Sequence, residues 1–191
     1  MESIYGEHLP KLEEIRLEME NRISKIREEI RENVGMDTIE HCLSRIKSEE
    51  SMREKCRRKH LPETAESALK IIHDAIGFRI VCAFVDDVYT IRDRLTAFED
   101  CKIIKEKDYI RHAKSNGYRS YHMILQVRGA YYVEFQLRTI SMDTWAALEH
   151  HLKYKKEIKN EELIIQELKR CADELASTDI TMQTIRDMIL E

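Results

Sequence analysis

The segment SYHMILQVRGAYYVEFQLRT, residues 120–139, decides the fold class because its apolar residues alternate with polar ones. In the second half, the apolar side chains fall on one face of an extended chain and Glu134 falls on the other. The first half alternates in the same way, and a turn near Gly129 can join the two. We therefore expect a β-hairpin with one core face, and, register permitting, His122 on the same face as Glu134.

A second strand is expected earlier in the chain. IGFRIVCAFV, residues 76–85, is rich in β-branched and aromatic residues, as a buried strand is. Asp86 or Asp87 can then cap an amphipathic helix. A weaker strand follows at residues 101–107, and helix returns from about Ile140. This order predicts a sheet built from strands, helices and a hairpin.

Helical periodicity marks both ends of the chain. Apolar residues recur every three or four positions from Leu9 to Val34, which is one face of a long helix that Gly35 can end. The chain is again helical from Lys156 onward, with apolar stripes. Because an apolar stripe needs a partner, we expect these helices to dock on another surface.

Further local structure is expected between the first helix and the sheet. Residues 39–47 form a short extended piece, and Ser48 is the N-cap of a basic helix that runs to about Lys59. Residues 62–64 open another helix that runs toward His73.

Composition limits the class of protein. A chain of 191 residues fits one domain with helical extensions. It contains no apolar run near the roughly 18 residues of a membrane span and no signal-peptide pattern, so we expect a cytoplasmic protein without membrane contact. Five cysteines without a CxxC pair indicate neither a disulfide framework nor a zinc site.

The net charge of −4 is unevenly distributed. Residues 45–60 hold seven Lys or Arg against three Glu, and residues 102–119 hold six against two acids, so each segment carries +4 and the remainder −12. Cations concentrated in an acidic chain favour local anion sites, such as phosphate sites, over a broad nucleic-acid surface. Solvated helix and loop faces are the alternative.

Two carboxylates stand out near the strands. Asp74 directly precedes the strand at residues 76–85, and Glu134 lies on the polar face of the hairpin. Two such carboxylates can hold Mg²⁺, which takes hard oxygen ligands and accepts the rest from phosphate and water. In the alternative, Asp74 caps an element and Glu134 pairs with Arg79 or Arg138.

Several longer motifs occur in a fixed order between Ile39 and Tyr154: SRIKSEESMREK, HDAIGFRIVCAFVDDVY, KDYIRHAKSNGYRSYH, VEFQLRT and WAALEHHLKYK. Together they resemble the synthetase domain of the RelA/SpoT family, and the chain as a whole resembles its small alarmone synthetases. The resemblance implies an α+β fold, with a nucleotidyltransferase-like mixed sheet flanked by helices. It also implies three parts: an N-terminal helical extension with a basic segment on the ATP side (1–65), a catalytic core (66–155) and C-terminal helices for oligomerisation (156–191).

The implied activity is transfer of pyrophosphate from ATP to the ribose 3′-hydroxyl of GDP or GTP, with release of AMP. Asp74 and Glu134 match the positions for catalysis and Mg²⁺, with Mn²⁺ as an alternative metal, and Glu134 matches a general base. The implied ATP-binding residues are Arg45, Lys47, Lys55 and Arg79. The implied guanosine nucleotide-binding residues are Lys107, Lys114, Asn116, Tyr118 and His122, with Tyr118 stacking on guanine. Supporting positions are Gln136, Arg138 and Glu149.

Other interpretations stay open at the level of sequence. Without the resemblance, Tyr118 is a packing residue and His122 an ordinary hydrogen-bonded histidine. The HD pair at residues 73–74 lacks the helical domain of an HD hydrolase, so synthesis without hydrolysis is implied. We expect a homotetramer; the acceptor among GDP, GTP and GMP, and a second alarmone or RNA site, are left open. The rival functions are a non-catalytic guanine-nucleotide or RNA-binding regulatory protein of the same fold and a helical scaffold.

Overall fold

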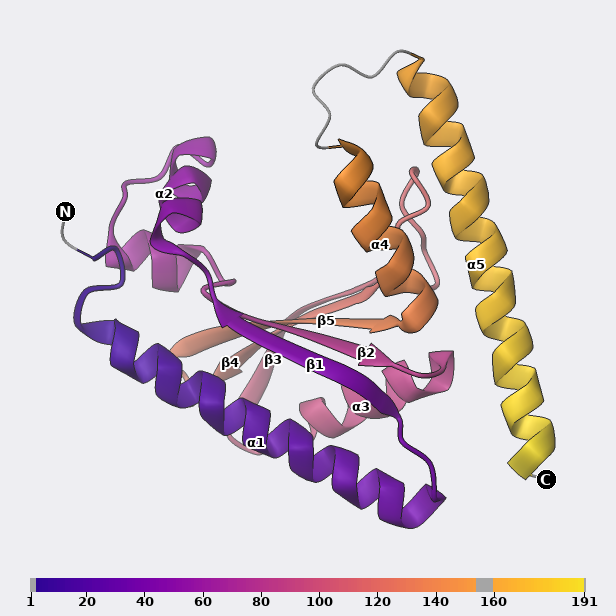
Figure 1. Ribbon diagram of the computed structural model, residues 1–191. Coiled ribbons are helices and arrows are strands. Elements are labelled where there is room, and N and C mark those ends of the chain that lie inside the picture. The colour runs from indigo at the N-terminus through magenta and orange to yellow at the C-terminus, as the bar shows by residue number, and fades with distance from the viewer. Residues whose placement is uncertain (1–2, 154–159, 191) are drawn as a thin grey trace.

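The computed structural model describes residues 3–153 and 160–190, and a five-stranded sheet forms its centre (Figure 1). The strand order is β1-β2-β5-β4-β3. The strands are β1 (Ile39–Ile46), β2 (Ile76–Cys82), β3 (Cys101–Asp108), β4 (Tyr121–Val127) and β5 (Tyr131–Thr139). β2 and β5 run parallel and the other neighbours antiparallel. The mixed sheet of the expected α+β fold is confirmed.

Helices lie on both sides of this sheet (Figure 1). α1 (Leu9–Val34) and α3 (Val85–Thr96) cover one face, whereas α2 (Glu49–Arg58) and α4 (Ile140–Lys153) stand on the other side. The remaining elements are η1 (Gly6–His8), η2 (Ser67–Ile71) and the C-terminal α5 (Glu161–Leu190). No helix within residues 3–153 or 160–190 is long and apolar enough to cross a membrane.

The hairpin of β4 and β5 has the predicted two faces. In Tyr121–Val127 and in residues 132–136, buried apolar residues alternate with half-buried ones, which are polar or aromatic except for Ile124. In the register of the pair, His122 lies opposite Gln136 and Ile124 lies opposite Glu134. Because residues two apart share a face, His122 and Glu134 lie on the same side of the sheet, as predicted.

Helix α1 confirms the long N-terminal helix and its end. Six residues of its apolar stripe are buried, and Gly35 caps the helix with φ 76° while its N–H donates to the carbonyl of Arg31. The stripe is shorter than predicted, because Leu9 and Val34 are exposed.

The predicted helix starts and ends between α1 and α3 agree only partly with the structure. α2 begins after Ser48, whose hydroxyl accepts from the N–H of Ser51, as predicted. The helix predicted to open near Thr64 and run toward His73 is confirmed in part: residues 65–71 are helical, with a π-helical turn at η2, and the segment ends two residues short of His73 because Ile72 has extended backbone angles. α3 begins two or three residues earlier than expected, because its N-cap is Phe84 and not Asp86 or Asp87; Asp87 lies inside its first turn, where its carboxylate accepts from the N–H of Phe84.

The N-terminal part contributes directly to the sheet. β1 lies within residues 1–65, yet it pairs along the length of β2 as an edge strand. A boundary between residues 65 and 66 therefore cuts through one sheet and one hydrophobic core.

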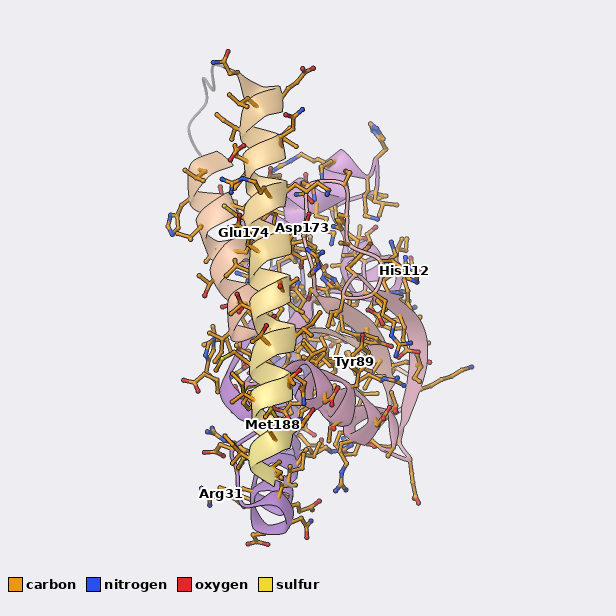
Figure 2. All side chains as sticks on the ribbon, turned by 90° about the vertical axis from the view of Figure 1, so that its right-hand side faces the viewer. Arg31, Tyr89, His112, Asp173, Glu174 and Met188 are labelled. Carbon is orange, nitrogen blue, oxygen red and sulfur yellow. The ribbon has the colours of Figure 1, made fainter. Side chains whose placement is uncertain are left out.

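Helix α5 runs along one side of the molecule (Figure 2). Only Ala172 and Asp179 are buried among its described residues, and large apolar side chains such as Met188 and Ile189 are exposed. The predicted helix start at Lys156 lies outside the described residues. α5 thus presents an apolar surface to solvent in the single chain.

Candidate active site

The two carboxylates predicted from the sequence line one cavity of about 170 Å³ beside strands β1, β2 and β5. Asp74 lies just before β2, and Glu134 in β5 is the register partner of Gly77 in β2. We call this hollow the carboxylate cavity; its lining residues are Leu43, Ser44, Arg45, Lys47, Asp74, Gly77, Phe78, Arg79, Glu134 and Gln136. Parallel pairing of β2 and β5 brings the two acids to it from distant parts of the chain.

Asp74 is an ionised carboxylate held by two lysines. Its Oδ2 lies 2.8 Å from Nζ of Lys47 and also accepts from Nζ of Lys55. Burial acts to raise the pKa of Asp74, but the hydrogen bonds and charges of the two ammonium groups outweigh it, and the pKa is lowered. The other oxygen, Oδ1, is buried and has no hydrogen-bond partner among the described residues.

Glu134 has the opposite electrostatic setting. Burial, with the negative charge of Asp74 second, raises the pKa of Glu134 above its usual value. Its Oε2 accepts a long hydrogen bond, 3.5 Å, from the side-chain amide of Gln136. A carboxylate with a raised pKa binds a proton more readily than an ordinary glutamate, which suits a general base.

A second cavity, of about 180 Å³, adjoins the same glutamate. We call it the lysine cavity; its lining residues are Lys105, Lys107, Tyr109, Lys114, His122, Met123, Ile124 and Glu134. The lysines provide positive charge for an anionic ligand. Glu134 therefore lies between two hollows, each lined by cations.

Tyr118 and His122 form a polar pair beside the lysine cavity. The Tyr118 hydroxyl lies 2.8 Å from Nε2 of His122 and accepts from Arg138 at 2.7 Å. Burial, followed by the charges of Arg138, Lys114 and Lys107, lowers the pKa of His122 to about 4. His122 is thus neutral near pH 7.

The loop that carries Tyr118 is shaped by its neighbours. Asn116 Oδ1 accepts from the N–H of Tyr118, and its amide nitrogen donates to Glu149 at 3.2 Å. Gly117 between them has φ 91°, in the left-handed region that glycine adopts without strain. Nζ of Lys114 lies 4.7 Å from the ring centre of Tyr118, within range of a cation–π interaction.

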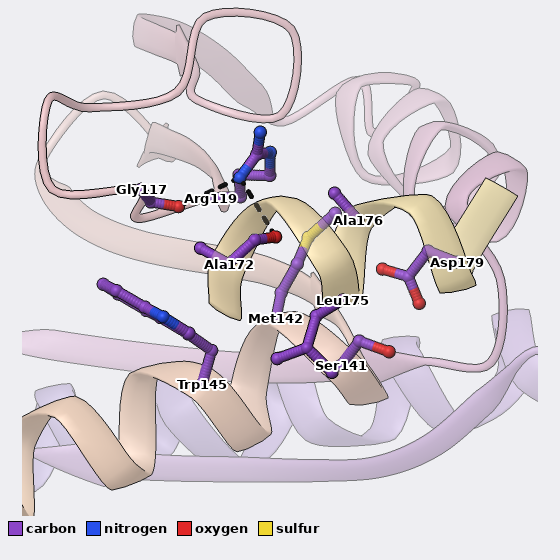
Figure 3. Close-up of a pocket in the computed structure, with 9 residues that line it drawn as sticks. All are labelled: Gly117, Arg119, Ser141, Met142, Trp145, Ala172, Leu175, Ala176 and Asp179. Carbon is purple, nitrogen blue, oxygen red and sulfur yellow. Dashed lines mark hydrogen bonds between the residues drawn. The ribbon is translucent and has the colours of Figure 1, made fainter. Parts of the chain in front are cut away.

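The same loop packs against α5 (Figure 3). A Cβ at Gly117 would lie 2.6 Å from the Cβ of Ala172, so only glycine allows this approach. Arg119 donates to the carbonyls of Gly117 and Ala172 and, at 2.9 Å, to Asp173. The pocket drawn in Figure 3 has a volume of about 10 Å³, close to the least that holds one water, so it is a packing gap.

Arg79 and Arg138 pair differently from the sequence-based alternative. That alternative pairs one of them with Glu134, whereas both guanidinium groups contact Asp143, at 3.5 Å and 3.0 Å. The alternative is wrong because Asp143, in the first turn of α4, lies over the same face of the sheet. Asp74 and Glu134 are thereby left facing the carboxylate cavity.

Comparison with known proteins identifies the family. The family described as "Region found in RelA / SpoT proteins" matches residues 44–159. The chain belongs to the RelA/SpoT family. It is 40% identical over 162 residues to GTP pyrophosphokinase YwaC and 35% identical over 160 residues to GTP pyrophosphokinase YjbM, both of Bacillus subtilis (strain 168). These alignments cover 81% and 80% of this chain and 77% and 74% of the two relatives.

Solved structures of RelA/SpoT relatives share the whole fold. Small alarmone synthetase 1 from Bacillus subtilis, bound to its product pppGpp, superposes with a TM-score of 0.81 at 30% identity and 96% coverage of both chains. A GTP pyrophosphokinase family protein from Streptococcus pneumoniae gives a TM-score of 0.82 at 33% identity, covering 96% of this chain and 93% of that one. The predicted resemblance to small alarmone synthetases is confirmed.

The residues that the RelA/SpoT motifs singled out fall into three groups. The carboxylate cavity collects Arg45, Lys47, Asp74, Arg79, Glu134 and Gln136, and Lys55 joins it through Asp74. The lysine cavity collects Lys107, Lys114 and His122. The third group, Asn116, Tyr118, Arg138 and Glu149, lines neither cavity but connects to the others through hydrogen bonds of the loop.

Sequence reasoning missed Lys105, Tyr109 and Asp143 as members of this region. Lys105 and Tyr109 line the lysine cavity and lie in or beside the predicted strand and basic segment, so the local charge was a usable signal. Asp143 offered a weaker signal, an acid in the first turn of a helix that follows VEFQLRT. Its pairing with arginines of two strands depends on the tertiary fold.

The site offers a hard divalent cation two protein carboxylates. Asp74 and Glu134 supply carboxylate oxygens to one cavity, and Asp74 Oδ1 is a buried acceptor with no hydrogen bond from the part of the chain that the structure describes. Within residues 3–153 and 160–190 there is no cluster of three or more Asp, Glu, His or Cys side chains arranged for a metal. The protein side of the site therefore suits Mg²⁺, which takes one or two carboxylates and completes its shell with phosphate and water.

Proposed function

We propose that this chain is a GTP pyrophosphokinase that synthesises guanosine alarmones: it transfers the pyrophosphoryl group of ATP to the ribose 3′-hydroxyl of GDP or GTP and releases AMP. The relatives named above, and the product bound to one of them, support this reaction class. The observation that carries it here is the position of Glu134, which lines both cavities. A carboxylate between two cation-lined hollows is placed to take a proton from a hydroxyl on one side as the oxygen meets a phosphate on the other.

ATP is the proposed ligand of the carboxylate cavity. Arg45, Lys47 and Arg79 line it and provide the charge that a triphosphate requires. Lys55 contacts Asp74 from α2 and completes the cationic side. Phosphoryl transfer depends on positioning and charge neutralisation more than on covalent chemistry, so such a set of cations suits the donor.

GDP or GTP is the proposed ligand of the lysine cavity. Lys107 and Lys114 are assigned to its phosphates, and neutral His122, whose Nε2 contacts Tyr118, is assigned to the nucleotide through its other ring nitrogen. Tyr118 is assigned to guanine stacking, with Asn116 holding the loop that presents it. GMP as an acceptor, and a separate site for an alarmone or for RNA, stay open.

Asp74 and Glu134 are the proposed holders of Mg²⁺, or of Mn²⁺ as an alternative. When bound, the metal supplies positive charge to the phosphate oxygens. Glu134 takes the proton of the 3′-hydroxyl; the 3′-oxygen bonds to the β-phosphorus, and the bond from that phosphorus to the α,β-bridging oxygen breaks. AMP leaves with the bridging oxygen. Gln136 orients Glu134, while Arg138 and Glu149 support the loop.

The decisive experiment is a product analysis. The purified chain is incubated with ATP, GDP or GTP, and Mg²⁺, and the nucleotides are separated by anion-exchange chromatography. We expect AMP together with a more highly charged guanosine nucleotide, and neither with Glu134→Gln. Bound guanine nucleotide without any AMP would overturn the proposal and favour the non-catalytic alternative.

The quaternary structure belongs to the same proposal. We propose a homotetramer, which is supported by the exposed apolar side chains along α5. The cytoplasmic location expected from the sequence stays a prediction.

A further inference from the structure

We propose that Asp143 is a positioning residue that couples the ATP subsite to the guanosine subsite, an inference that rests on the proposed function. Asp143 lies in the first turn of α4 and lines neither cavity. Its side chain is only 19% exposed. Its contacts nevertheless reach both subsites through two arginines.

The carboxylate of Asp143 is shared between strands β2 and β5. One oxygen, Oδ1, accepts a hydrogen bond from Arg138 at 3.0 Å and lies 3.5 Å from the guanidinium of Arg79. Arg138 is almost fully buried, with a side-chain exposure of 6%. A buried guanidinium needs a compensating charge, and Asp143 supplies one.

The two arginines contact residues of different proposed nucleotide subsites. Arg79 lines the carboxylate cavity beside Gln136, its register partner in β5. Arg138 donates through its second terminal nitrogen to the Tyr118 hydroxyl at 2.7 Å and to Gln136 Oε1 at 2.9 Å. Tyr118 in turn lies 2.8 Å from His122, which lines the lysine cavity.

The planar shape of a guanidinium makes this arrangement act as a unit. When Asp143 fixes one terminal nitrogen of Arg138, the plane of the group is set and its other nitrogen is aimed at Tyr118. Without the carboxylate, Arg138 and Arg79 would face each other as like charges near one point. Both would move, so the loss of one residue outside the cavities disturbs both subsites.

The first test measures the binding of each substrate by titration calorimetry, with GDP for the acceptor and a non-hydrolysable ATP analogue for the donor. Asp143→Asn removes the charge but keeps the shape. We expect it to weaken both nucleotides, each by about threefold to tenfold. Asp143→Glu, which restores the carboxylate, should recover part of both affinities.

A double-mutant cycle tests the coupling itself. The measured quantity is the free energy of binding both nucleotides to one chain. In the wild-type chain, Arg79→Gln and Tyr118→Phe should change this free energy non-additively. In the Asp143→Asn background, their effects should be additive. A role in folding alone would lower the melting temperature without changing this coupling.

The matched control is Asp100→Asn. Asp100 also contacts two arginines, Arg22 at 2.7 Å and Arg128 at 3.7 Å, but neither arginine lines either cavity. Its substitution should leave both affinities unchanged.

The outcomes separate this inference from the proposed function. If the wild-type chain binds both nucleotides but the cycle is already additive, or if Asp143→Asn keeps both affinities within about twofold, Asp143 does not couple the subsites. If the wild-type chain binds neither nucleotide, the proposed function fails and this inference fails with it.

Discussion

Two carboxylates in one cavity, Asp74 and Glu134, have opposite protonation tendencies. Two lysine ammonium groups contact Asp74 and keep its pKa low, whereas Glu134 is buried beside that negative charge and its pKa is raised. Cation binding at the cavity would relieve the repulsion between them. The pair is therefore poised for a metal at some cost to the stability of the ligand-free chain.

Substitution of the two carboxylates should change stability in opposite directions. Asp74→Asn leaves Lys47 and Lys55 without their shared charge, so we expect a loss of about 1 to 3 kcal/mol in the free energy of unfolding. Glu134→Gln removes a charge that folding disfavours, so the free energy of unfolding at pH 8 should be unchanged or higher. Both variants should lose turnover. Urea denaturation without nucleotide measures the difference, and a loss of equal size in both would contradict these assignments.

His122 should make stability depend on pH. Its pKa falls from 6.5 to about 4 on folding, so between these values the unfolded chain binds more protons than the folded one. Stability should decrease as pH falls through this window, by on the order of 3 kcal/mol in total for this residue. His122→Gln, which cannot titrate, should show a smaller decrease between pH 7 and pH 5 in urea denaturation. Parallel pH profiles for the two proteins would show that the His122 pKa is not lowered.

At the scale of elements, the contact between α5 and the loop of residues 116–119 ties the proposed acceptor subsite to the C-terminal helix. Gly117 meets Ala172 at a distance that leaves no room for a Cβ, and Arg119 joins the loop to the helix by hydrogen bonds. The position of α5 therefore helps to determine where Tyr118 lies.

Gly117→Ala should impair acceptor binding in particular. The new methyl group meets Ala172, and the left-handed backbone adds strain, so we expect the KM for GDP to rise by about fivefold to thirtyfold while the KM for ATP changes little. Gly129→Ala is the matched control, because Gly129 also has a positive φ, 69°, but a methyl group there would meet no described atom within 4 Å beyond its chain neighbours. The double substitution Gly117→Ala with Ala172→Gly should recover part of the loss. An effect no larger than that of the control would show that the α5 contact does not position the loop.

For the whole molecule, the exposed apolar side chains of α5 predict self-association. Met188 and Ile189 are 70% and 73% exposed. Exposure of such apolar side chains to water is unfavourable and marks a surface for interaction with another chain. Light scattering should give a mass about four times that of the 22.7 kDa chain. Ile189→Lys should lower this mass, whereas Ile71→Lys, at an exposed apolar residue of η2, should not. A wild-type mass equal to that of one chain would reject the homotetramer.

The periodicity of apolar residues alone predicted the central hairpin and the N-terminal helix of this protein. The alternation in residues 120–139 predicted the hairpin and the shared face of His122 and Glu134, and the α1 stripe with Gly35 predicted the first helix and its end. These patterns are local consequences of burying one face of a strand or helix. Motif order added the family and the choice of candidate site residues.

Tertiary structure decided how those residues connect. The parallel pairing of β2 with β5 places Asp74 and Glu134 in one cavity. The packing of α4 over the sheet brings Asp143 into contact with Arg79 and Arg138. Local sequence could not show this, because an arginine can pair with any carboxylate within reach and chain folding alone sets which one that is. The same limit applies to the helix predicted toward His73, which ends at Ile71 because the extended path into β2 begins at Ile72.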